Sequence, residues 1–305
     1  MSPMIELREV GLRDGLQLVG RHPETAQKQR WLGAAHEAGV RHFEVGSHLP
    51  ARTAPQFADI DALVATVGRL PGARCAVLAL NDRGLQNAIA GDAHDIGMVI
   101  SATEAHSQRN MRRSRDQAIE LVARAVALNR ETGAGKRIVA GVAMAFGCSI
   151  TGQVAPAEVL RLAERLIEAG ADAISIADTV GYAGPRQVHS LVTAIGRLAG
   201  GRPLGIHLHD TRGLGLANAA AAIEAGATLI DAATGGLGGC PFAPGASGNI
   251  VFEDLVFLCQ TMGLATGIDI ERLVAARALL AEAMPEEPMF GAIARTELPI
   301  GHHQL

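Results

Sequence analysis

The chain of 305 residues has a net charge of −4, and its basic residues gather only between Arg109 and Arg115, which argues against a nucleic-acid partner. Hydrophobic residues make up 48% and aromatic residues 3%, so Ala, Val, Leu and Ile must fill the core, as in buried parallel strands. There is no apolar run of about 18 residues and no signal or transit segment, so we expect a cytoplasmic protein without a membrane partner.

Strand-like and helix-like segments alternate along the whole chain. The predicted strands are 5–10, 42–45, 75–80, 95–101, 137–145, 173–177, 205–209 and 228–232. Between them, apolar residues recur at helical spacing, and several of these segments end just before a glycine, a common helix C-cap. The predicted helices are 25–38, 115–131, 156–169, 185–198, 215–225, 249–262 and 270–284.

This alternation predicts the fold class. Eight βα units without a linker indicate a closed parallel (β/α)8 TIM barrel with extra C-terminal helices, rather than an open doubly wound sheet. No GxGxxG motif follows the first strand, so a dinucleotide-binding fold has no support. We assign residues 1–284 to a catalytic barrel that includes the C-terminal helices, and residues 285–305 to a tail that is a lid or disordered. The helices after the eighth strand offer a face for a homodimer.

The strongest candidate site residues follow the seventh strand. Active sites of such barrels lie at the C-terminal ends of the strands. His207 and His209 are two residues apart there, so both imidazoles point to one face and can reach one metal ion. The alternative is a pair of histidines hydrogen-bonded within the barrel mouth. Asp14, after the first strand, favours a metal site, because a carboxylate suits a hard divalent cation.

Three further charged residues lie at strand ends. Arg13 lies between Gly11 and Gly15, and its guanidinium can stabilise a developing oxyanion; a surface ion pair in a turn is the alternative. Glu44 ends the second strand, and we expect it to hold Arg13 in place. Asp178 ends the sixth strand and either belongs to the site or orients backbone or an arginine.

The four cysteines form no CxxC pair, which predicts neither a disulfide framework nor a zinc knuckle. Cys240 lies in a Gly-rich loop after the eighth strand, where an exposed thiol can donate a proton or act as a nucleophile. The alternative is a small buried hydrophobe, which suits Cys75 and Cys259 better, with Cys148 intermediate. Asn249, taken by itself, fits an N-cap of the next helix.

Together, residues 13–17, 207–210 and 235–249 resemble the metal-dependent lyases and synthases built on TIM barrels, the DRE-TIM metallolyases. The Cys240 loop is most similar to that of the 3-hydroxy-3-methylglutaryl-CoA lyases, and the resemblance covers nearly the whole chain. It implies a Mg²⁺ or Mn²⁺ ion bound by four residues. These are Asp14, His207, His209 and Asn249.

The resemblance also implies the chemistry. It describes a carbon–carbon lyase that cleaves 3-hydroxy-3-methylglutaryl-CoA, or a related branched hydroxyacyl-CoA, to acetyl-CoA and a 3-oxo acid by retro-aldol or Claisen chemistry. Arg13 would stabilise the enolate of the leaving thioester, and Cys240 would handle a proton on its carbon. His207 would also take the hydroxyl proton, and Glu44 and Asp178 match carboxylates of the family. The acyl-CoA partner rests on the resemblance alone.

Three stretches depart from the family pattern, and all three are predicted to lie at the barrel mouth. Leu18-Val19 replaces Asn-Glu, Gly46-Ser47-His48 replaces Thr-Ser-Phe, and Cys148-Ser149-Ile150-Thr151-Gly152 replaces Cys-Pro-Tyr-Glu-Gly. These departures leave the substrate open. One alternative is an aldolase or Claisen-type synthase acting on a different hydroxy acid. Another is a non-catalytic barrel that binds a metabolite.

Overall fold

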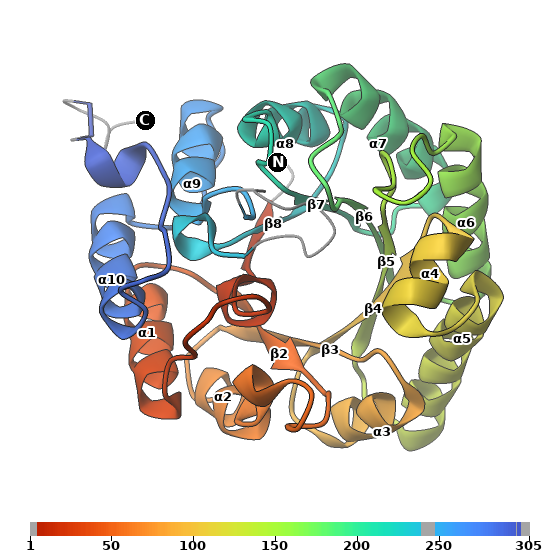
Figure 1. Cartoon of the computed structure of the whole chain (residues 1–305), viewed down its shortest axis with the longest axis horizontal. Coiled ribbons are helices and arrows are strands. Elements are labelled where there is room, and N and C mark those ends of the chain that lie inside the picture. Colours follow the sequence, from red (N-terminus) through yellow and green to blue (C-terminus); the bar gives the residue numbers. More distant parts are fainter. Residues whose placement is uncertain (1–4, 239–247, 297, 300–305) are drawn as a thin grey trace.

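The computed structural model describes residues 5–238, 248–296 and 298–299. Eight parallel strands form a closed barrel in which each strand pairs with the next and β8 pairs with β1 (Figure 1). The strands are Glu6–Glu9 (β1), His42–Ser47 (β2), Arg74–Leu78 (β3), Asp95–Ser101 (β4), Arg137–Ala143 (β5), Ala173–Asp178 (β6), Leu204–Leu208 (β7) and Leu229–Ala232 (β8). The predicted TIM barrel is confirmed, and every predicted strand is present.

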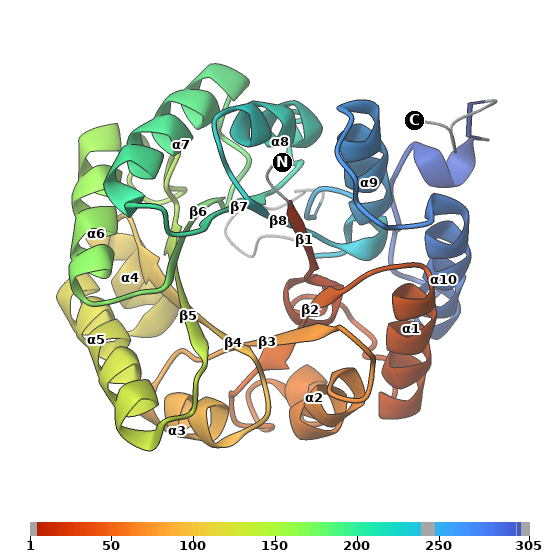
Figure 2. The ribbon, with the colours of Figure 1, turned by 180° about the vertical axis from the view of Figure 1, so that it is seen from behind.

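Helices surround the strands in an outer ring, and α10 lies beside α1, so the two ends of the ring meet (Figures 1 and 2). The helices are Thr25–Glu37 (α1), Ile60–Val67 (α2), Asp82–Ala90 (α3), Glu104–Met111 (α4), Arg115–Thr132 (α5), Pro156–Glu168 (α6), Pro185–Ala199 (α7), Gly215–Glu224 (α8), Phe252–Thr261 (α9) and Ile270–Ala283 (α10). The sequence analysis missed α2, α3 and α4, because helices of eight or nine residues show barely two turns of apolar periodicity.

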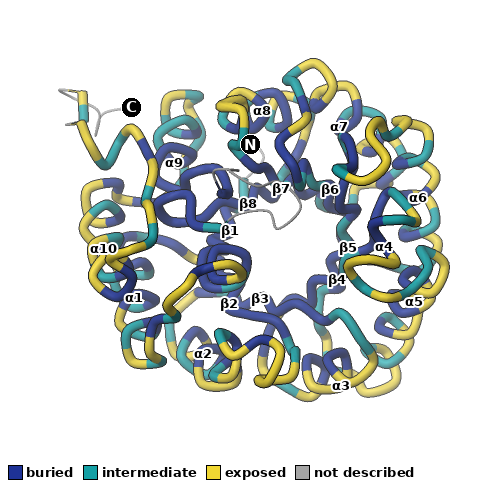
Figure 3. Tube along the Cα trace, in the orientation of Figure 1, coloured by how far each residue is buried: buried dark blue, intermediate teal, exposed yellow. Residues whose placement is uncertain are grey.

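The core lies between the strands and the inner faces of the helices, while the outer helix faces are exposed (Figure 3). Trp31 of α1 packs edge to face on Phe43 of β2, with ring centroids 6.2 Å apart. Among the described residues, no helix is both long and apolar enough to cross a membrane.

The described part of the C-terminal tail is attached to the barrel. The amide of Phe290 donates to the carbonyl oxygen of Gly235, at 2.7 Å, in the turn that follows β8. The amide of Gly20 donates to Glu287, also at 2.7 Å. The tail thus contacts the loops after β1 and β8, which carry several of the candidate site residues.

Charged side chains converge at the N-terminal ends of the strands. Asp95, the first residue of β4, is fully buried and lies 2.9 Å from His42, 2.6 Å from Arg74 and 2.7 Å from Arg137. Burial by itself would raise the pKa of Asp95, but hydrogen bonds from His42 and Arg137 outweigh burial and hold this pKa well below its ordinary value. Asp95 is therefore ionised in the folded state and joins β2, β3, β4 and β5.

We expect Asp95→Asn to lower the free energy of unfolding at neutral pH by about 3–5 kcal/mol, the cost of breaking a buried ion pair on one side. The pKa of Asp95 is lower in the folded than in the unfolded state, so its stabilisation is present above about pH 4 and is lost as the pH falls below that value. Urea titrations at several pH values should therefore show a smaller acid-induced loss of stability in the variant. Asp92→Asn, on the exposed surface, is the control; equal acid sensitivity of Asp95→Asn and the wild type would contradict this account.

Candidate active site

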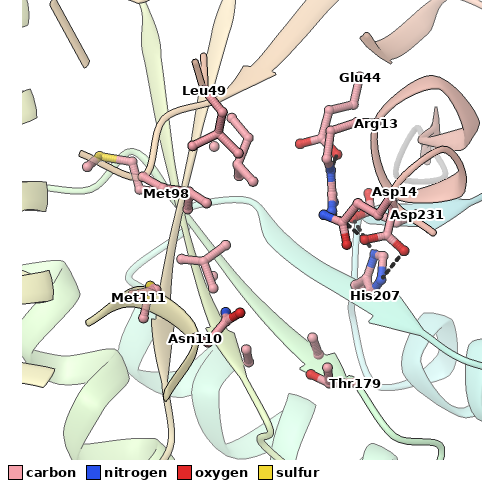
Figure 4. A pocket seen from close by; sticks show the side chains of 18 of the residues that line it. Arg13, Asp14, Glu44, Leu49, Met98, Asn110, Met111, Thr179, His207 and Asp231 are labelled. Atoms are coloured by element: carbon pink, nitrogen blue, oxygen red, sulfur yellow. Dashed lines mark hydrogen bonds and ion pairs between the residues drawn. The ribbon is translucent and has the colours of Figure 1, made fainter. Parts of the chain in front are cut away.

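A single turn of π-helix, Gly11–Gly15, carries the first two site residues. The amide groups of Arg13, Asp14 and Gly15 converge on the carbonyl oxygen of Val10, at 3.1, 2.8 and 3.3 Å. This wide turn follows β1 directly, so the side chains of Arg13 and Asp14 face the C-terminal mouth of the barrel (Figure 4). Single π-turns of this kind are frequent at functional sites.

Asp14 meets the two histidines of the seventh strand. One carboxylate oxygen of Asp14 and one ring nitrogen of each of His207 and His209 all lie within 4.8 Å of one another. The Nε2 atoms of His207 and His209 are 3.2 Å apart. Oδ2 of Asp14 lies 3.8 Å from Nε2 of His207 and 3.5 Å from Nε2 of His209. This spacing matches the prediction that both imidazoles point to the same face, and the three groups can converge on one cation.

Asn249 completes the cluster rather than capping a helix. Helix α9 begins at Phe252, whereas Asn249 forms a backbone bridge with His209. Its Nδ2 donates to Oδ2 of Asp14 and to the carbonyl oxygen of Leu237, each at 2.8 Å. Its Oδ1 is buried and has no hydrogen-bond partner among the described residues. The donor set is one carboxylate, two imidazoles and one amide whose oxygen lacks a partner, and this set fits a divalent cation.

Arg13 connects this cluster to β2. It forms ion pairs with both Asp14 and Glu44, so the predicted contact between Arg13 and Glu44 is present. Burial by itself would raise the pKa of Asp14, but Arg13 and a hydrogen bond from His209 outweigh burial and hold this pKa well below its ordinary value. The Asp14 carboxylate is therefore ionised and available as a ligand, beside a permanently charged guanidinium.

The cluster forms one wall of a cavity of about 520 Å³ at the centre of the barrel. In Figure 4 the polar side chains of Arg13, Asp14 and His207 lie on one side of it, and Met98 and Met111 lie on the other. A cavity with one charged wall and one largely apolar wall suits a small molecule that has a polar end and an apolar part.

The HMGL-like family model matches residues 4–280. The chain belongs to the HMGL-like family.

Hydroxymethylglutaryl-CoA lyase YngG of Bacillus subtilis is 33% identical over 280 residues, which are 92% of this chain and 93% of that protein. Hydroxymethylglutaryl-CoA lyase of Pseudomonas mevalonii is 34% identical over 267 residues, 88% of each chain. An HMG-CoA lyase of Acinetobacter baumannii, solved with coenzyme A and 3-methylmalate, superposes with a TM-score of 0.91 at 33% identity, covering 99% of this chain and 97% of that one. The protein is thus an enzyme of the carbon–carbon lyase class.

In this HMGL-like barrel, an arginine and an aspartate missed by the sequence analysis orient His207. Oδ2 of Asp231 on β8 lies 3.2 Å from Nδ1 of His207, and Arg8 on β1 donates to both oxygens of Asp231 at 2.8 and 2.9 Å. Burial by itself would raise the pKa of Asp231, but Arg8 outweighs burial and holds it well below its ordinary value. An ionised carboxylate only accepts, so Nδ1 donates this hydrogen bond, and Nε2 of His207 faces the cluster. The available signal was Asp231, the single charged residue of the otherwise apolar strand β8.

Asp178 has a different environment from the other site candidates. Its carboxylate oxygens accept hydrogen bonds from the amide groups of Tyr182 and Ala183, at 2.8 and 3.0 Å, and burial raises its pKa. It is not among the described residues that line the cavity. Asp178 therefore anchors the loop that follows β6, and a direct role in the reaction stays a prediction.

The cysteines divide between buried positions and the Gly-rich loop. Cys75 and Cys259 are fully buried, and burial raises the pKa of each thiol to about 12, as expected for small hydrophobic residues. Cys148 is also buried, with its sulfur 3.2 Å from Oγ1 of Thr103. Cys240 lies outside the described residues, so its predicted part in proton transfer stays a prediction.

The three departures from the family pattern lie in different places. Leu18 lines the cavity beside the charged wall. His48 instead borders a separate cavity of about 410 Å³, together with Asp61 of α2 and Asn87 of α3. Residues 149–151 are not part of the described lining of either cavity. Leu18 is therefore the replacement that lines the central cavity, and a contact of the other two stretches with the substrate stays a prediction.

Proposed function

We propose that this HMGL-like enzyme is a divalent-metal-dependent lyase that cleaves a branched 3-hydroxyacyl-CoA to acetyl-CoA and a 3-oxo acid. Its substrate is 3-hydroxy-3-methylglutaryl-CoA or a related thioester. The observation that carries the proposal is the convergence of Asp14, His207 and His209 within 4.8 Å, on the wall of a cavity that a partly buried Arg13 also lines. The lyase relatives and the solved lyase with bound coenzyme A support the substrate class.

Asp14, His207, His209 and Asn249 would hold the ion, Mg²⁺ or Mn²⁺. When bound, such an ion supplies Lewis-acid chemistry that lowers the pKa of the substrate hydroxyl. The hydrogen bond to Asp231 holds Nδ1 of His207, so Nε2 faces the cluster, where it would ligate the ion or take the proton of the substrate hydroxyl.

Cleavage follows once the hydroxyl proton has passed to Nε2 of His207, the base in this proposal. The oxygen electron pair forms the new carbonyl group, the adjacent carbon–carbon bond breaks, and its electrons pass to the departing thioester as an enolate. Arg13, held by Glu44, donates hydrogen bonds to the enolate oxygen and stabilises its charge. Cys240 would then deliver a proton to the enolate carbon.

Product analysis by mass spectrometry tests the proposal. Purified protein is incubated with 3-hydroxy-3-methylglutaryl-CoA together with Mg²⁺, Mn²⁺ or a chelator, and we expect acetyl-CoA and acetoacetate only when the metal is present. Unchanged turnover in the chelator would contradict the metal requirement. Because Leu18 changes the cavity wall, the alternative is an aldol or Claisen reaction on another hydroxy acid. That alternative predicts product from short hydroxy diacids and none from the CoA thioester.

A further inference from the structure

On the apolar side of the central cavity, three strand residues leave space that side chains do not fill. Val99 of β4, Gly141 of β5 and Ala177 of β6 are partly exposed, although they lie within strands and the residues on either side of each are buried. All three line the central cavity. Val99 pairs with Gly141 across the sheet, and Ala177 pairs with His207, so this wall continues from the apolar side to the candidate metal ligands. The partial exposure of these three residues is therefore exposure to the cavity.

Small residues produce this opening. Barrel interiors are usually filled by layers of bulky branched side chains, but the wall here is lined by Gly141, Ser175 and Ala177. A Cβ atom on Gly141 would have as its nearest neighbours the carbonyl oxygen of Met98, at 3.7 Å, and Cβ of Ser175, at 3.9 Å, which are ordinary contacts. By contrast, a Cβ atom on Gly97 would lie 3.1 Å from Leu78. Crowding therefore does not require glycine at position 141, and the space beside it belongs to the cavity.

The charged wall determines what faces this space. In the proposed reaction the hydroxyl-bearing carbon carries a hydroxyl, a carboxylate arm, a thioester arm and a branch. The hydroxyl and carboxylate belong at the cluster of Asp14, His207 and His209, because these polar groups of the substrate need the polar side chains and the ion that the cluster would hold. The thioester arm must lead to the mouth, where Asn110 and Arg113 line the cavity. The branch is then left facing the apolar wall.

We propose that this wall selects a branch longer than methyl, an alkyl chain of several carbons that lies along Val99, Gly141 and Ala177. The inference rests on the proposed lyase function and specifies its substrate class. Gly141 is the specificity-determining residue, because a side chain at this position would occupy the space that the alkyl branch fills. Each methylene buried there should raise kcat/KM about four-fold, the gain from transferring one methylene group out of water.

Gly141→Leu tests the inference by filling the space. Its Cβ meets no close contact, and glycine weakens the interior of a strand, so the barrel should fold. Wild type should prefer 3-hydroxy-3-propylglutaryl-CoA over the 3-methyl substrate by about 16-fold in kcat/KM, because the propyl group has two more methylene groups to bury. The variant should lose at least about 10-fold on the propyl substrate and retain the methyl one. Gly33→Leu, on α1 with open space around its Cβ, is the matched control and should leave the preference unchanged.

A binding measurement separates this inference from the proposed function. 3-Propylglutaryl-CoA and 3-methylglutaryl-CoA lack the hydroxyl group and are not cleaved, so their Kd values, obtained by calorimetry, report on the wall alone. Tighter binding of the propyl analogue, cancelled by Gly141→Leu, supports the inference even if wild type cleaves no hydroxyacyl-CoA, an outcome that would refute only the lyase proposal. Equal Kd values for the two analogues, binding of neither, or a preference that survives Gly141→Leu would overturn the inference.

Discussion

Arg13→Met should lower kcat by about 10²–10³-fold while the protein still binds its divalent ion. Arg13 forms ion pairs with Asp14 and Glu44 and lines the cavity, so its guanidinium is oriented before substrate arrives. Methionine retains much of the side-chain volume but provides neither charge nor hydrogen-bond donors. Steady-state kinetics would report the loss of turnover, and calorimetric titration with Mn²⁺ would report the retained ion.

Two further variants make this result specific to Arg13. Arg83→Met, on the exposed face of α3, makes the same substitution away from the cavity and should leave kcat unchanged. Arg13→Lys keeps the positive charge but not the planar fork that reaches both carboxylates, so its kcat should lie between those of wild type and Arg13→Met. An unchanged kcat in Arg13→Met would remove enolate stabilisation by this residue from the mechanism.

His209→Ala should weaken binding of the divalent ion by at least about 100-fold, the upper end of what the loss of an outer-shell partner costs, and turnover should fall with it. Nε2 of His209 lies 3.5 Å from Oδ2 of Asp14 and 3.2 Å from Nε2 of His207, so its removal leaves two donors from the side-chain cluster and the amide of Asn249. Calorimetric titration with Mn²⁺ measures the affinity, and assays at increasing Mn²⁺ show whether activity returns.

His189→Ala is the matched control, because His189 lies on the exposed face of α7. It should bind the ion as wild type does. If His209→Ala bound Mn²⁺ with wild-type affinity, the imidazole pair would be a hydrogen-bonded pair in the barrel mouth, which was the alternative interpretation of the sequence. Thermal unfolding of both variants would show whether the loss of an imidazole changes stability as well as ion binding.

Local patterns in the sequence were sufficient to predict the barrel and the site residues that lie at the ends of its strands. Strand and helix periodicities are properties of neighbouring residues, so the eight strands followed from the sequence with errors only at their ends. The spacing of His207 and His209 placed both rings on one face for the same reason. Arg13, Asp14 and Glu44 could be placed at the mouth because all parallel strands of a barrel end on one side.

Only the tertiary structure decided how these residues are supported and what faces them. Arg8 and Asp231 are 223 positions apart, and they meet because closure of the barrel pairs β1 with β8. Asn249, taken by itself, fitted a helix cap, although the resemblance to the family implied a metal ligand, and only the folded chain brings it beside His209. The open wall at Gly141 depends on three strands in register, since a glycine in the sequence does not reveal whether a neighbour fills its space. Contacts between distant segments depend on strand register and closure, which no local periodicity encodes.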